Sequence, residues 1–154
     1  MDIKDKKSGL ETYISILNMD KTENQLYLKN TKELLVNTNK DILETKNLIN
    51  SLDDKIREIS SIGGNFPIGA YELLRRNIDT AIENEERLIK SEKELSVEYD
   101  VQLQKLHKKL KSIDICNEKQ KEYTMLIQQY QDKKLSSELD ELCGQRKWIL
   151  ENND

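Results

Sequence analysis

A seven-residue repeat runs through the first part of this chain. Between Leu10 and Ile59, positions separated by alternating steps of four and three residues hold mostly Leu and Ile, although Asn24 and three threonines interrupt the middle. Such positions form one stripe along a helix, which is typical of a coiled-coil seam. The predicted seam comprises Leu10, Ile14, Leu17, Lys21, Asn24, Leu28, Thr31, Leu35, Thr38, Ile42, Thr45, Ile49, Leu52, Ile56 and Ile59. We expect four further residues to widen its apolar face: Leu26, Leu34, Leu43 and Leu48.

One strong break interrupts the helical pattern, at SIGGNFPIGAY, residues 61–71. This stretch holds the chain's only proline, its only phenylalanine and three of its five glycines. Gly63 suits a helix end and Pro67 suits the first turn of the next helix. Because the connection is short, we expect the second helix to return along the first. The prediction is an all-α fold, a long two-helix antiparallel coiled-coil hairpin in a single domain, 1–154, with helices over about 6–62 and 67–150 and a bend at 63–67.

The second helix is expected to be the longer one. Its apolar positions begin with Tyr71, Leu74, Ile78, Ala81, Leu88, Leu95 and Tyr99. The step from Tyr99 to Leu103 and Leu106 suggests four inserted residues, a stutter that would locally unwind a supercoil. With a bend near residue 64, residue x pairs with roughly 128 − x. The final 25 to 30 or so residues are therefore expected to pass beyond the start of the first helix, unless the N-terminal segment follows them.

This last segment carries apolar side chains that nothing else in the chain is expected to cover, namely Leu135, Leu139, Leu142 and Trp148. An uncovered apolar stripe on a helix is a candidate partner site, with self-association or fraying as the alternatives. Gly144 leaves the continuity of this part of the helix open.

Composition argues against several classes of protein. The net charge of −4 arises from 29 acidic and 25 basic residues, so no broad basic face for nucleic acid is expected. No apolar run suits a signal peptide or a membrane span, and we expect a cytoplasmic protein without membrane insertion. Cys116 and Cys143 are far apart in sequence and are interpreted as free thiols.

Residue patterns for catalysis are missing from the sequence. His107 lacks an orienting partner, the Gly63–Gly64 pair lacks the rest of a phosphate loop, and no His or Cys cluster has zinc spacing. We therefore expect no enzyme activity, cofactor or metal. The densest basic run is either a solvated helix face or a surface for an acidic protein: Lys105, Lys108, Lys109 and Lys111.

The layout resembles the FliJ/YscO/InvI family of type III secretion and flagellar export proteins. Two stretches carry the resemblance: AYELLRRNIDTAIENEERL, residues 70–88, is similar to the start of the second helix in InvI-type members, and SSELDELCGQRKW, residues 136–148, is similar to the family's C-terminal pattern. Together they cover about 30 residues. The many Lys, Asn and Ile residues depart from the Arg- and Gln-rich sequences typical of that family.

The resemblance implies a central stalk, similar to the gamma subunit of rotary ATPases. Such a stalk enters the ring of the type III export ATPase, promotes ring assembly and activity, and links the ring to the cytoplasmic domain of the export gate at the inner membrane. Some members also bind secretion chaperones. We expect a monomer. The alternative is a coiled-coil adaptor, chaperone or tether unrelated to secretion.

Two sets of candidate site residues follow from this interpretation. The ATPase-ring set is Leu135, Glu138, Leu139, Asp140, Glu141, Leu142, Arg146 and Trp148. The set near the bend, for the gate or a chaperone, is Phe66, Tyr71, Arg75 and Arg76.

Overall fold

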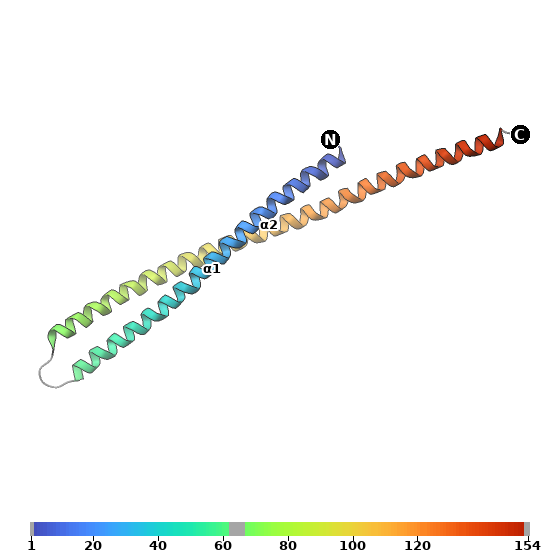
Figure 1. Ribbon diagram of the computed structural model, residues 1–154. Coiled ribbons are helices and arrows are strands. Elements are labelled where there is room, and N and C mark those ends of the chain that lie inside the picture. The colour runs from blue at the N-terminus through green and yellow to red at the C-terminus, as the bar shows by residue number, and fades with distance from the viewer. Residues whose placement is uncertain (1, 62–66, 153–154) are drawn as a thin grey trace. The chain divides into compact units, whose positions relative to one another are not determined.

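The structure is a computed structural model that describes residues 2–61 and 67–152 (Figure 1). It contains two helices, α1 over Ile3–Ser61 and α2 over Ile68–Glu151, of 59 and 84 residues. No strand occurs in the described residues, and α1 and α2 pack against each other. The prediction of an all-α helical hairpin with a longer second helix is confirmed. Pro67 directly precedes α2, and its carbonyl accepts a hydrogen bond of 3.0 Å from the Tyr71 backbone N–H.

The chain divides into two compact units, each built from a part of α1 and a part of α2. One unit spans Glu23–Leu106, and the other comprises the residues up to Thr22 and those from His107 onward. In the first unit, the Tyr27 hydroxyl donates a hydrogen bond to the Glu98 carboxylate, whereas Ile56 packs against Ile78. Later residues of α1 therefore meet earlier residues of α2, which makes the packing antiparallel.

The predicted seam of α1 is the face that packs on α2. Every seam position from Leu10 to Ile59 is buried or half-buried. The apolar members with 9% exposure or less are Leu17, Leu28, Ile42, Leu52 and Ile56. The period of seven residues thus locates the buried stripe correctly along the whole helix, because side chains at that spacing return to the same side.

The polar positions in the seam differ in how their hydrogen bonds are satisfied. Thr31 and Thr45 are buried, and their hydroxyls donate to the backbone carbonyls of Tyr27 and Asp41, at 2.9 and 2.8 Å. The Nδ2 atom of Asn24, in contrast, is buried without a hydrogen-bond partner among the described residues. The threonines therefore fit the seam at little cost, while Asn24 weakens it.

The stutter predicted in α2 is wrong. Tyr99 and Leu106 are seven residues apart, and both belong to one stripe of buried or half-buried residues, with half-buried Gln102 between them. The same stripe continues through half-buried Lys109, whereas Leu110 is 36% exposed at its edge. Apolar residues beside the stripe suggested a change of register, but the packing keeps the seven-residue period and accepts polar side chains within it.

The four leucines expected to widen the seam of α1 also lie elsewhere. Their side chains are between 52% and 60% exposed: Leu26, Leu34, Leu43 and Leu48. Leu34 and Leu43 are direct neighbours of the seam residues Leu35 and Ile42, and each residue turns the helix by about 100°. Each helical turn contributes only about one residue to the seam. A leucine directly before or after a seam residue therefore points well away from α2.

A cluster of buried apolar residues lies near the end of α1 and the start of α2. Leu52, Ile56 and Ile78 form it, and the partly buried Tyr71 and Leu74 pack against it. These contacts hold the two helices together next to the connection between them.

Candidate interaction surface

The end of α2 is a helix that no other described part of the chain covers. We call residues 128–152 the terminal extension; every one of them is exposed. The helix remains continuous through Gly144 to Glu151, so the glycine does not end it. The prediction that the last residues pass beyond the first helix is confirmed for the described residues.

The contact between the two helices ends in a shallow groove of about 460 Å³. The first turn of α1 contributes Ile3 and Lys4, and α2 contributes Ile127, Tyr130 and Lys134 among others. Ile127 is the last half-buried residue of α2. The groove reaches into the first two turns of the extension, where Tyr130 and Lys134 line it.

The eight candidate residues for the ATPase ring do not share one face. Leu135, Leu139 and Leu142 are separated by four and three residues, so they lie on the same side of α2. Trp148 follows Leu139 by nine residues, which is about two and a half turns and places it on the opposite side. The structure therefore separates the tryptophan from the leucines with which it was grouped.

The charged candidates are divided in the same way. Arg146 follows Leu142 by four residues and lies on the leucine side, and Glu138 borders it. Asp140 and Glu141 point away from the leucines, because one- and two-residue steps turn a helix by about 100° and 200°.

Two residues that sequence reasoning missed complete the leucine side, Asp132 and Ile149. Their positions continue the alternating steps of three and four residues, which is the signal that would have found them. We define the extension stripe as Asp132, Leu135, Leu139, Leu142, Arg146 and Ile149.

The extension stripe is not a continuation of the hairpin seam. Continuing the seam of α2 beyond Ile127 at its own spacing leads to Tyr130, Lys134, Ser137, Glu141, Gly144 and Trp148. Leu135 instead lies eight residues after Ile127, rotated by roughly a quarter of a turn. The stripe is therefore a separate apolar surface with its own direction. A hollow of about 390 Å³ borders the stripe, and Ile149 of the stripe lines it together with Gly144, Gln145 and Trp148.

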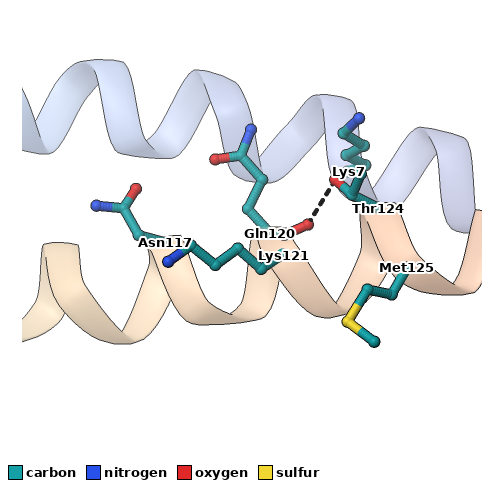
Figure 2. A pocket seen from close by; sticks show the side chains of 6 residues that line it. All are labelled: Lys7, Asn117, Gln120, Lys121, Thr124 and Met125. Carbon is teal, nitrogen blue, oxygen red and sulfur yellow. Dashed lines mark hydrogen bonds between the residues drawn. The ribbon is translucent and has the colours of Figure 1, made fainter.

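A second open pocket, of about 600 Å³, lies between the start of α1 and the middle of α2 (Figure 2). Lys7 lines it from α1, and Lys121 and Met125 are among the residues that line it from α2. The Thr124 hydroxyl donates a 2.9 Å hydrogen bond to the Gln120 carbonyl, as Figure 2 shows. Its described lining consists of two lysines, two side-chain amides, a hydroxyl and a thioether.

Near the connection, the structure places the second candidate set partly in the core. Tyr71 packs against the apolar cluster beside it, while Arg75 and Arg76 are exposed and form no salt bridge with another described residue. Phe66 lies outside the described residues. Farther along α2, Lys109 is half-buried in the seam, whereas Lys105, Lys108 and Lys111 are exposed.

Within residues 2–61 and 67–152, no group of three His, Cys, Asp or Glu side chains could hold a metal ion. Neither described helix has a segment long and apolar enough to cross a membrane. Cys116 is half-buried and Cys143 is exposed, and both are free thiols. Comparison of the chain with family models, with curated proteins and with solved structures found no match.

Proposed function

We propose that this protein is a non-enzymatic interaction protein, and specifically a central stalk of a type III export apparatus at the cytoplasmic face of the inner membrane. The observation that carries the proposal is the terminal extension, residues 128–152, a fully exposed helix held out by a two-helix hairpin. An exposed helix with apolar side chains at three- and four-residue spacing is suited to binding in a groove between other protein elements.

The proposed partner is the ring of the export ATPase, on the basis of the resemblance described above. In this proposal the extension enters the ring, and the opposite end of the hairpin meets the export gate or a secretion chaperone. The charged candidates Glu138, Asp140, Glu141 and Arg146 are exposed and would contact the ring. Polar contacts of this kind guide association and fix orientation more than they add affinity.

The test is ATP hydrolysis by the export ATPase of the same organism, with and without this protein. We expect several-fold stimulation and a larger ATPase assembly in size-exclusion chromatography. The variant Glu138→Gln/Asp140→Asn/Glu141→Gln should lose the stimulation. A control in the hairpin, Asp79→Asn/Glu83→Gln/Glu86→Gln, also removes three exposed acids but lies outside the extension, and it should retain the stimulation.

The absence of both stimulation and co-elution with the ATPase would contradict the stalk proposal. The function would then be that of a coiled-coil adaptor, chaperone or tether, for which the same extension would serve a different partner.

A further inference from the structure

The extension stripe has the spacing of a helix that packs against a second helix. Its six positions are separated by steps of three, four, three, four and three residues, and four of them are Leu or Ile. Leu135, Leu139, Leu142 and Ile149 are each more than half exposed. Alternating steps of this kind let side chains interlock with those of a facing helix along a continuous line.

This chain does not supply that facing helix. The first turn of α1 meets α2 at the groove lined by Ile127, Tyr130 and Lys134, and no described residue of α1 lines α2 beyond Lys134 there. Because the stripe is rotated from the seam, a helix that simply prolonged the line of α1 would not cover it. None of the described residues covers the stripe.

We infer that a second copy of this chain covers the extension stripe, with the two extensions antiparallel. The two charged residues of the stripe decide the direction. Asp132 lies near one end and Arg146 near the other, and both are exposed. In a parallel pair, Asp132 would lie beside Asp132 of the second copy and Arg146 beside Arg146, and these like charges repel each other. In an antiparallel pair, Asp132 of each copy lies near Arg146 of the other, and the opposite charges attract each other.

One antiparallel register fits the stripe. Leu139 faces Leu142 of the second copy, and Leu135 faces Arg146 of the second copy. Asp132 of the second copy then faces position 149, so it lies three residues, about 4.5 Å along the axis, from Arg146 and within reach of the long arginine side chain. The two-fold axis makes every contact occur twice. The axis passes between Asp140 and Glu141, at the middle of the terminal extension, so the two exposed segments overlap along their whole length.

This inference does not rest on the proposed function, because self-association needs no ATPase. If both hold, an ATPase ring that takes up the extension must displace the second copy. Binding to the ring and dimerisation would then compete.

The first experiment is sedimentation equilibrium of the purified full chain over a range of concentrations. We expect the average mass to rise from 18.1 kDa towards twice that value as concentration increases. Leu139→Ala/Leu142→Ala should weaken dimerisation at least about tenfold, and Trp148→Ala, on the opposite side, should leave it unchanged. Circular dichroism checks that the variants remain helical. A chain that stays monomeric throughout overturns the inference.

A charge exchange tests the pairing without removing apolar groups. Asp132→Arg alone and Arg146→Asp alone should each weaken dimerisation by several-fold, because each creates like-charged contacts between copies. Mixing the two variants should restore a dimer of wild-type affinity, since each chain then faces the opposite charge. Lys133→Asp, which lies outside the stripe, is the control and should have no effect. Failure of the mixture to regain affinity overturns the pairing.

Direction is tested by crosslinking with a short bis-maleimide in a Cys116→Ser/Ser136→Cys variant. The antiparallel register places position 136 beside Cys143 of the second copy, so the 136–143 product should dominate. Predominance of 136–136 and 143–143 products would show a parallel pair and overturn the proposed arrangement.

Discussion

The side-chain amide of Gln120 donates a hydrogen bond of 3.2 Å to Oε1 of Glu11, across 109 residues of sequence. This contact fixes which part of α2 lies beside the start of α1. The two numbers sum to 131, close to the value of roughly 128 expected for a hairpin turning near residue 64.

That contact predicts a crosslink. In a background with Cys116→Ser and Cys143→Ser, Glu11→Cys/Gln120→Cys should react with a short bis-maleimide within one chain. The matched control, Glu11→Cys/Ser136→Cys, moves one position 16 residues along α2, about 24 Å, and should not react within one chain. Mass spectrometry of the monomer band distinguishes the two, and equal yields would contradict the antiparallel register.

The apolar cluster next to the connection should dominate the stability of that end of the hairpin. Ile78 is 5% exposed and contacts Leu52 and Ile56. We expect Ile78→Ala to lower the free energy of unfolding by about 2–4 kcal/mol, because it removes buried methyl groups and leaves a void. Leu73→Ala, at a residue 60% exposed, should change it by less than about 0.5 kcal/mol. Urea denaturation followed by circular dichroism measures both, and similar losses would argue against the cluster.

Asn24 offers a stabilising substitution. Its Nδ2 atom is buried without a hydrogen-bond partner among the described residues, and the residue occupies a seam position. Asn24→Leu should raise the free energy of unfolding by about 1 kcal/mol, since it removes an unsatisfied polar group and adds apolar burial. The exposed Asn37→Leu is the matched control and should change it little. A loss of stability in Asn24→Leu would indicate that the amide serves the register of the seam.

Gly144 should be a weak point of the terminal extension. An added Cβ would meet no atom within 4 Å, and the residue is helical. Gly144→Ala should therefore stabilise the local helix by about 1 kcal/mol, because alanine loses less backbone entropy. Hydrogen exchange should slow around positions 140–150 and remain unchanged around 71–81. Faster exchange near 144 would contradict a continuous helix there.

The helices and the seam of α1 were predictable because they depend on spacing. A seven-residue period brings side chains to one side of a helix whether the residue is Ile42, Thr45 or Asn24, and the structure buries or half-buries all of them. Predictions based on residue type were less successful. Leu103 and Leu110 suggested a stutter that does not exist, and Leu34 and Leu43 remain exposed beside the seam.

The sequence predicted which segment of α2 is uncovered, but not which of its side chains lie on the same side of the helix. Counting residues from the bend located an uncovered end of α2, and the structure agrees within the described residues. Grouping Trp148 with the leucines was wrong, because apolar character carries no information on rotation about the helix. Counting by turns separates Trp148 from Leu139 and adds Asp132 and Ile149 to the same side.

The amino-acid sequence alone therefore settles that this chain forms two unequal helices and which side of the first one is apolar, since both are local properties of periodicity. The packing of α1 against α2 decides that Ile127 is the last half-buried residue of α2, and it leaves the extension stripe exposed beside the line of the seam. Whether a side chain is buried depends on which part of the other helix faces it. That information comes only from the tertiary structure, in which the two helices lie side by side.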